Sequence, residues 1–258
     1  MMEELGCRMG RVEQMIRYAY WSSGCKGIVI GASGGVDSSV ALAFCCRAIG
    51  PANVLALSLP SQVSNPQDTR DATDLCASLG VRHQVIGIGP VLDAYRTMPG
   101  FVETPALSGN LMARIRMAVL YYHANRDTLL VCGTSNKSEL LLGYFTKFGD
   151  SAADIQPILH LYKTDVYEMA RELKILDPII RKPPSAGLWA GQTDEGEIGL
   201  SYAEIDASLQ ALEKRAWTAV TPTEEKVLAL VKKSAHKRMP APSLSGEPRV
   251  PAGDARDS

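Results

Sequence analysis

The chain has 258 residues, of which 46% are apolar, and its formal net charge is −1. This length and apolar fraction suffice for one substantial α/β core, so we predict a single domain over residues 1–240. The near-neutral charge gives no overall basic field for nucleic acid or an anionic membrane. No apolar run approaches the roughly 18 residues of a membrane span, and the N-terminus lacks a signal-peptide pattern. We therefore expect a cytoplasmic protein without a nucleic-acid or membrane partner.

Two further compositional features bear on the compartment and on the end of the chain. The six cysteines form no C-x-x-C pair and lie mostly in apolar stretches, which favours reduced core thiols over disulfides. Residues 241–258 are crowded with Pro, Ser, Gly and charge and have no periodic apolar pattern. Such a segment cannot bury enough apolar surface to offset its ordering entropy, so we predict a disordered C-terminal tail.

Short apolar runs alternate with helical patterns through the first half of the chain. The pattern predicts strands at residues 27–31, 54–59, 81–86 and 128–132. It predicts helices at residues 37–49, 66–79 and 110–125, with another beginning near residue 137. This alternation predicts an α/β fold, an open parallel sheet with helices on both faces, similar to a Rossmann fold. Right-handed crossovers then place the loops that follow the strands at one edge of the sheet.

The second half gives mixed signals. Helical patterns appear at residues 163–173, 202–212 and 222–233, and the loops between them are rich in Gly, Pro and Asp. We expect this half to handle ligands. No H-E-x-x-H helix occurs, so a zinc protease site is not indicated.

A glycine-bearing loop separates the first predicted strand from its helix and reads Ser33-Gly34-Gly35-Val36-Asp37-Ser38-Ser39. The unpaired N–H groups and the dipole at the start of a helix favour an anion. Glycines let the backbone approach a phosphate closely, and serine hydroxyls add donors. A carboxylate at Asp37 beside phosphates makes sense only with Mg²⁺ between them. We predict a phosphate site suited to pyrophosphate as a leaving group.

The spelling of this loop narrows the choice of nucleotide sites. It lacks the Gly-Lys-Ser or Gly-Lys-Thr ending of a Walker loop and the G-x-G-x-x-G of a dinucleotide loop. The structural alternative is that Ser33 and Asp37 only cap the helix while the glycines form a turn. The loop resembles the S-G-G-x-D-S signature of the ATP pyrophosphatase (PP-loop) superfamily, whose members cleave ATP to AMP and pyrophosphate. That resemblance implies an adenine nucleotide alpha hydrolase-like fold and leaves the substrate open.

A second strand end repeats this arrangement, in the run Gly133-Thr134-Ser135-Asn136-Lys137-Ser138-Glu139. A hydroxyl occurs early in the loop and a carboxylate occurs in the helix that follows. Glu139 is therefore a candidate to share Mg²⁺ with Asp37. The alternative is a capping box, because a hydroxyl residue followed by Glu is typical of a helix start.

Two further segments are candidates for binding the other substrate. Asn110 and Arg114 are four residues apart on a predicted helix, so they share one face that could hold an anion. The alternative is an amphipathic helix with solvated arginines. Residues 143–157 mix aromatics, Lys147 and two acids without helical or strand periodicity. Aromatics could stack on a planar ring, Lys147 could contact a phosphate, and Asp150 or Asp154 could bind ribose hydroxyls or a positively charged ring.

Taken in order, seven motifs resemble the NAD synthetase family over roughly residues 14–240. The motifs are G-N-x-x-A-R-x-R-M, G-T-S-N-K-S-E, G-Y-F-T-K-F-G-D, L-Y-K-T-D-V, K-P-P-S-A-G-L-W, G-Q-T-D-E and H-K-R. The resemblance implies a C–N bond-forming ligase that amidates deamido-NAD with ammonia through an acyl-adenylate, giving NAD, AMP and pyrophosphate. One departure is Ser151, where many relatives have glycine, and we expect activity to survive it.

The resemblance also assigns site residues, with ATP and Mg²⁺ as co-substrate and metal. For ATP it implies Gly31, Ser33, Gly34, Gly35, Val36, Asp37, Ser38, Ser39, Thr134, Lys163 and Ser185. For Mg²⁺ it implies Asp37 and Glu139, which with Lys163 are the predicted catalytic residues. For deamido-NAD, the resemblance and the two candidate segments described above together give seven residues: Asn110, Arg114, Lys147, Asp150, Asp154, His236 and Lys237. It further implies a homodimer, with helices around Tyr121 and Tyr122 near the interface.

Two classes of alternative function stay open at this stage. The first is another PP-loop ATP pyrophosphatase, such as a GMP synthetase, an asparagine synthetase or a tRNA thiolation enzyme. The lack of a C-x-x-C pair and of a basic stripe argues against thiolation. The second is a sensor that binds ATP without turnover. The paired acids argue against it, because binding alone needs fewer carboxylates near phosphate.

Overall fold

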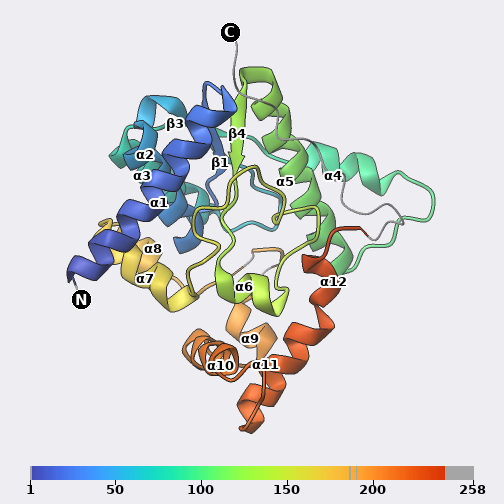
Figure 1. Ribbon diagram of the computed structural model, residues 1–258. Helices are drawn as coiled ribbons and strands as arrows, with labels where there is room; N and C mark the ends of the chain where they lie inside the picture. Colours follow the sequence, from blue (N-terminus) through green and yellow to red (C-terminus); the bar gives the residue numbers. More distant parts are fainter. Residues whose placement is uncertain (1, 186, 190, 242–258) are drawn as a thin grey trace.

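The computed structural model describes residues 2–185, 187–189 and 191–241, and its core is a four-stranded parallel sheet (Figure 1). The strand order is β3-β2-β1-β4. The strands are β1 (Gly27–Gly31), β2 (Val54–Ser58), β3 (Arg82–Val85) and β4 (Leu129–Cys132). The predicted open parallel sheet is therefore confirmed. Strand β2 pairs with one side of β1, and β4 pairs with the other side. The strand order therefore reverses between β1 and β4. Open α/β sheets bind their ligands at such a switch point.

Side chains of the central strands alternate between two apolar clusters, which is why both faces of the sheet need helices. Ile28 and Ile30 belong to one cluster, with α1 (Met2–Ser23), α2 (Val36–Ile49), α3 (Pro66–Leu79) and α7 (Lys163–Glu172). Val29 belongs to the other cluster, with α4 (Gly89–Arg96) and α5 (Pro105–Asp127). Helices thus cover both faces, as predicted.

Local signals explain most helix boundaries. In α3 the Asn65 side chain accepts from the N–H of Gln67, and Gly80 ends the helix with a φ of 69°. Helix α5 begins five residues earlier than predicted, because Thr104 caps it and Pro105 occupies its first turn. The sequence analysis did not predict α1 or α4. Helix α1 packs Met9, Val12 and Ile16 into the first cluster through a spacing of three and four residues.

The second half forms a smaller helical layer with its own apolar cluster, at the bottom of Figure 1. Its predicted helices are α6 (Lys137–Leu142), α10 (Tyr202–Lys214) and α11 (Pro222–Lys233). The short helices α8 (Asp177–Arg181), α9 (Asp194–Ile198) and α12 (Ala235–Arg238) were not predicted. Of the tail predicted at residues 241–258, residues 242–258 lie outside the residues that the structure describes.

The described residues also bear on two compositional expectations. Within them, no helix is both long and apolar enough to span a bilayer. All six cysteines fall in the described ranges and are free thiols, and four of them, Cys45, Cys46, Cys76 and Cys132, are buried. The expectation of reduced thiols, mostly in the core, is confirmed.

Candidate active site

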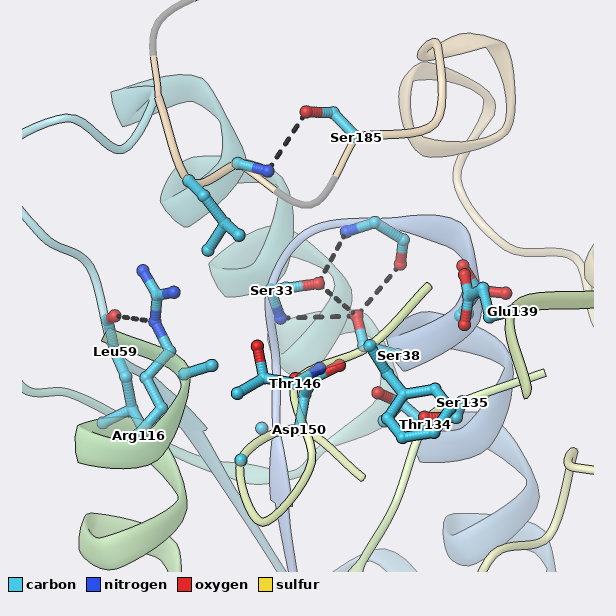
Figure 2. A pocket seen from close by; sticks show the side chains of 18 of the residues that line it. Ser33, Ser38, Leu59, Arg116, Thr134, Ser135, Glu139, Thr146, Asp150 and Ser185 are labelled. Carbon is cyan, nitrogen blue, oxygen red and sulfur yellow. Dashed lines mark hydrogen bonds between the residues drawn. The ribbon is translucent and has the colours of Figure 1, made fainter. Parts of the chain in front are cut away.

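A cavity of about 510 Å³ opens at the carboxyl ends of β1 and β4, and the phosphate loop forms one of its walls (Figure 2). Six of the predicted ATP residues line it here: Gly31, Ser33, Gly35, Val36, Asp37 and Ser38. The loop is held by its own hydroxyls, with the Ser33 and Ser38 Oγ atoms 2.9 Å apart. The N–H of Gly35 donates to Ser33 Oγ at 3.2 Å. These contacts preorganise the loop around the start of α2, where an anion is favoured.

Gly34 is required for a reason other than the one predicted. Its φ is 77°, and a Cβ there would lie 2.1 Å from the carbonyl oxygen of Asp68 on α3. The loop therefore packs backbone to backbone against α3, which only glycine permits. Lys182 secures this contact, because its Nζ bonds the carbonyl of Gly34 at 3.0 Å and the carboxylate of Asp68 at 2.6 Å.

The second strand end meets the first as predicted. Thr134 lines the cavity, and Asn136 caps α6 in a capping box with Glu139. A capping box is thus present, but its cap is Asn136 and not the expected hydroxyl residue, Thr134 or Ser135, and it does not exclude the site. The Asn136 Nδ2 also donates to Asp37 Oδ1 at 2.8 Å, so one amide joins the two loops.

Lys163 lies between the two predicted metal ligands. Its Nζ is 2.5 Å from Asp37 Oδ2 and 3.3 Å from Glu139 Oε1. The lysine is 2% exposed, and its ammonium also lies 4.9 Å from the ring centroid of Tyr202. Lys163 thus stands behind the carboxylates and is not among the residues that line the cavity. The structure brings together all three residues predicted to be catalytic.

In this cluster three carboxyl groups share one ammonium, and the pKa values of Glu139 and Asp194 are raised. Burial raises the pKa of Glu139 to about 8, and repulsion from Asp37 adds to the shift. Burial opposes the charge of Lys163, yet the carboxylates of Asp37 and Glu139 raise its pKa above the ordinary value. Asp194 is nearby, and its pKa is raised chiefly by burial. Burial thus favours the protonated forms of Glu139 and Asp194 beside this ammonium.

The residues fit a Mg²⁺ ion whose coordination is completed by phosphate and water. Asp37 and Glu139 offer carboxylate oxygens, the donors that Mg²⁺ prefers, and Mg²⁺ is commonly bound through one or two carboxylates plus substrate phosphates. Within the described residues no group of three or more His, Cys, Asp or Glu side chains is placed to hold a metal. The fit thus depends on the nucleotide supplying the remaining oxygens.

The opposite wall comes from α5 and the loop of residues 143–157. Asn110 and Arg114 do share a face, because both meet this loop. Asn110 Oδ1 accepts from the Thr146 hydroxyl at 2.7 Å, and Arg114 Nη2 donates to the Lys147 carbonyl at 3.3 Å. Asp150 lines the cavity, accepts from the N–H of Thr146 at 2.8 Å, and has a pKa raised by burial.

Several predicted residues are bonded to protein groups and are not among the cavity-lining residues. Ser39 is 1% exposed and donates its hydroxyl to the Gly35 carbonyl. Lys147 Nζ donates to the carbonyls of His236 and Met239, each at 2.9 Å. Asp154 accepts from the N–H of Val131 at 2.7 Å. The residues absent from the cavity lining are Gly34, Ser39, Lys163, Arg114, Lys147, Asp154 and His236.

Lys237 and Ser185 do line the cavity. The Lys237 Nζ donates to the carbonyls of Gly143 and Phe145, at 2.7 and 2.8 Å, so it fastens the start of the 143–157 loop to α12. Ser185 Oγ accepts from the N–H of Gly187 (Figure 2).

The sequence analysis missed other polar residues that line the cavity. They include Asp68, Arg116, Tyr144, Thr146, Lys182, Gln192, Asp194 and Glu197. Arg116 donates through Nε to the Leu59 carbonyl at 3.0 Å (Figure 2), and burial lowers its pKa. Tyr144 donates to Glu197 at 2.7 Å. Most of these residues lie inside the motifs quoted above, so the motifs could have indicated that they belong to the site. Their roles could not be predicted, because they depend on contacts between distant segments.

A phosphate loop at the switch point of a parallel sheet, faced by a second acidic strand end, defines an α/β nucleotide-binding enzyme of the ATP pyrophosphatase type. The model of the NAD synthase family matches residues 9–241. The chain belongs to this family, whose members use ATP as a co-substrate.

Individual relatives agree with this assignment. The chain is 69% identical to the NH(3)-dependent NAD(+) synthetase of Methanoregula boonei, over 96% of this chain and 100% of that one. Its fold is similar to NMN synthetase from Francisella tularensis, with a TM-score of 0.85, 36% identity and coverage of 93% and 98%. It is also similar to the NH3-dependent NAD synthetase from Campylobacter jejuni, with a TM-score of 0.80, 34% identity and coverage of 93% and 99%.

Proposed function

We propose that this protein amidates deamido-NAD with ammonia at the expense of ATP, giving NAD, AMP and pyrophosphate. The observation that carries the chemistry is the meeting of Asp37 and Glu139 beside the phosphate loop, joined by Asn136 and Lys163. The identity of 69% to an ammonia-dependent NAD synthetase supports the choice of substrates. The protein is thus a ligase that forms a C–N bond.

The reaction divides into two steps. The carboxylate of the nicotinate ring attacks the α-phosphorus of ATP, which forms an acyl-adenylate and releases pyrophosphate. Ammonia then attacks the acyl carbon, and AMP leaves as the amide forms. No protein nucleophile is needed, so catalysis rests on in-line positioning and on neutralising charge between two anions.

The residues on the phosphate side have separable tasks in the first step. The backbone N–H groups at the uncapped start of α2 hold the leaving phosphates, while the hydroxyls of Ser33 and Ser38 shape the loop around them. Lys163 keeps the carboxylates of Asp37 and Glu139 together and offsets part of their charge. Asp37 and Glu139 would hold Mg²⁺, which when bound supplies positive charge to the triphosphate.

The deamido-NAD site draws on the opposite wall. Asn110 and Asp150 face the cavity, and Lys237 holds the loop that contains Asp150. Arg114, Lys147, Asp154 and His236 lie beyond the cavity lining, so we assign them to the more distant half of the dinucleotide. That assignment places one half of the substrate in the cavity and extends the other half over the 143–157 loop.

We also propose the organisation of the chain in solution. Residues 1–240 form one domain. The enzyme is a homodimer, supported by the exposure of Tyr122 on α5, whose side chain is 64% accessible. Six free cysteine thiols support a reducing, cytoplasmic location.

One assay tests the function and its rivals together. The protein is incubated with ATP, Mg²⁺, ammonium and deamido-NAD while NAD, AMP and pyrophosphate are quantified. We expect the three products in equal amounts and none of them without deamido-NAD. A failure to form NAD above a control without enzyme would refute the proposal. AMP release with xanthosine monophosphate or aspartate would indicate another PP-loop enzyme, and binding of ATP without AMP release would indicate a sensor.

Two further comparisons test which substrate accepts the amide nitrogen and which compound supplies that nitrogen. The similarity to an NMN synthetase makes nicotinate mononucleotide the sharpest competing acceptor. We expect kcat/KM to be higher for deamido-NAD than for the mononucleotide, and the reverse order would reassign the substrate. Replacing ammonium by glutamine should abolish turnover, because the chain matches ammonia-dependent relatives over nearly its whole length.

A further inference from the structure

We propose that Asp206 is a positioning residue for the magnesium and ATP site, a role that rests on the function proposed above. Asp206 lies on α10, outside the cavity lining, and is 2% exposed. It touches neither the phosphate loop nor the predicted metal ligands. Its carboxylate instead joins the two helix starts from which Glu139 and Lys163 project.

The contacts of Asp206 account for both of its oxygens. Oδ1 accepts the hydroxyl of Ser138 in the first turn of α6, and Oδ2 accepts the N–H of Thr164 in the first turn of α7 at 2.8 Å. Ser138 Oγ in turn accepts the N–H of Lys163 at 3.0 Å. Asp206, Ser138 and the backbone of Lys163 and Thr164 thus form one bonded bridge, which we call the α6–α7 bridge.

This bridge fixes the spacing of the site residues. Ser138 directly precedes Glu139, and Thr164 directly follows Lys163, so each bridged residue is the chain neighbour of a site residue. The Lys163 Nζ to Glu139 Oε1 distance of 3.3 Å therefore depends on the two helix starts keeping their positions. Tyr202, also on α10, places its ring against the Lys163 ammonium. One helix thus supports the backbone and the side chain of Lys163.

The chemistry of the bridge requires a carboxylate. Both groups facing Asp206 are donors, because the Ser138 oxygen already accepts the Lys163 N–H and turns its hydrogen to Asp206. A carboxylate offers acceptors on both oxygens, whereas an amide offers one oxygen and one NH₂. Asp206→Asn therefore leaves one donor facing a donor while preserving shape. This near-isosteric change disturbs the spacing without emptying a cavity.

The test measures binding without turnover. Calorimetry gives the affinity of wild type and of Asp206→Asn for α,β-methylene-ATP, a non-cleavable analogue, with and without Mg²⁺. We expect the gain in affinity that Mg²⁺ confers to fall about 10-fold in the variant. This is the lower end of the loss caused by changing a group that bonds a metal ligand, because Asp206 acts through the chain neighbours of the site residues. Affinity for the analogue without Mg²⁺ should stay within about 2-fold of wild type, because the hydrogen bonds of Asp206 go to Ser138 and Thr164 and not to the phosphate loop.

Glu224→Gln on α11 is the matched control. Glu224 is a buried carboxylate of the same helical layer, 6% exposed, which pairs with Arg215 and accepts the N–H of Val220 just before α11. Both variants should lower the unfolding temperature, but only Asp206→Asn should reduce the Mg²⁺-dependent gain. An equal reduction in both variants, or none in Asp206→Asn, would overturn the proposal.

A second variant keeps the test decisive if Asp206→Asn does not fold. Ser138→Ala removes the hydroxyl of the bridge and should cause a smaller loss of the same kind, and an unchanged Mg²⁺-dependent gain there would overturn the proposal. The measurement is also independent of the proposed function. If wild type binds the analogue but makes no NAD, the function is wrong, while the comparison of variants still decides the role of Asp206.

Discussion

The two walls of the cavity are built in different ways. The phosphate wall consists of two strand ends, and its residues Ser33, Asp37 and Glu139 lie within a few positions of β1 or β4. The opposite wall is α5 with the 143–157 loop, which lacks regular structure over most of its length. Lys147 of the loop and Lys237 of α12 fasten this loop to the segment near residue 236. The phosphate wall is thus positioned by the sheet, whereas the opposite wall depends on long-range hydrogen bonds.

The largest effect should come from the phosphate wall. Asp37→Ala is expected to lower kcat/KM by about 1,000-fold or more, because the triphosphate loses the charge that compensates it during attack. Removing Asp37 also leaves Lys163 with Glu139 as its remaining carboxylate partner in the cluster. Turnover is measured as NAD and AMP formation, and far-UV circular dichroism checks the fold. Wild-type rates in this variant would refute a metal role for Asp37.

On the opposite wall the expected effect is smaller and of another kind. Lys147→Met should raise the KM for deamido-NAD about 10-fold while the KM for ATP stays unchanged. Its ammonium holds the carbonyls of His236 and Met239, and a charge-assisted hydrogen bond contributes about 1.5–3 kcal/mol. About 1.4 kcal/mol corresponds to 10-fold in affinity.

Lys137→Met is the matched control for that variant. Lys137 also carries a bonded ammonium, 2.8 Å from Glu213, but it is not among the residues that line the cavity. It should leave both KM values near wild type. If Lys147→Met raises the KM for ATP as strongly as that for deamido-NAD, the two walls do not act separately.

The same contrast explains what could be predicted from the sequence. The sheet, the helix α3 and the pairing of Asp37 with Glu139 follow from apolar runs, glycines and caps that act within a few residues. The capping box at Asn136 shows how a local signal can carry two roles, since this residue both caps α6 and bonds Asp37. The sequence alone could not show the second of these roles, because Asn136 and Asp37 are 99 positions apart in the chain.

The residues that were missed or misplaced depend on packing between segments. Arg116 and Asp194 line the cavity only because α5 and α9, which are far apart in the chain, both reach it, and no local pattern specifies this. Lys163 was predicted as an ATP ligand, but in the structure its ammonium is bonded to carboxylates. A charged residue in a motif thus indicates where the site lies, but its role follows only from its contacts in the structure.

A stability prediction sharpens the description of the phosphate wall. Gly34→Ala should lower the free energy of unfolding by about 3 kcal/mol, from left-handed strain together with overlap with the Asp68 carbonyl. Gly80→Ala provides the reference, because its φ is 69° and nothing lies within 4 Å of its Cβ position. It should cost about 1 kcal/mol, the strain alone. Denaturant unfolding measures both, and equal losses would mean that α3 does not support the loop.

The smallest expected effect concerns pH and the sheet that positions the phosphate wall. Burial lowers the pKa of His83, His123 and His160 below 6.5. The unfolded chain therefore takes up protons first as the pH falls through 6.5, and stability is lost toward the lower folded-state pKa values. The histidines therefore lower the unfolding temperature between pH 7 and pH 5.5, by about 2–4 °C for each kcal/mol lost. Glu139 contributes in the opposite direction, because its pKa of about 8 lets the folded chain hold an extra proton over this range.

His83→Gln isolates the contribution of the sheet. The His83 Nε2 lies 2.8 Å from Ser58 Oγ, and the Ser58 hydroxyl donates to the Ala32 carbonyl next to the phosphate loop. Since that hydroxyl proton is already used, His83 donates from Nε2, and an amide NH₂ can replace that donor without titrating. The variant should therefore show a shallower decline in unfolding temperature over the same range. An unchanged slope would mean that His83 is not one of the groups whose protonation weakens the fold.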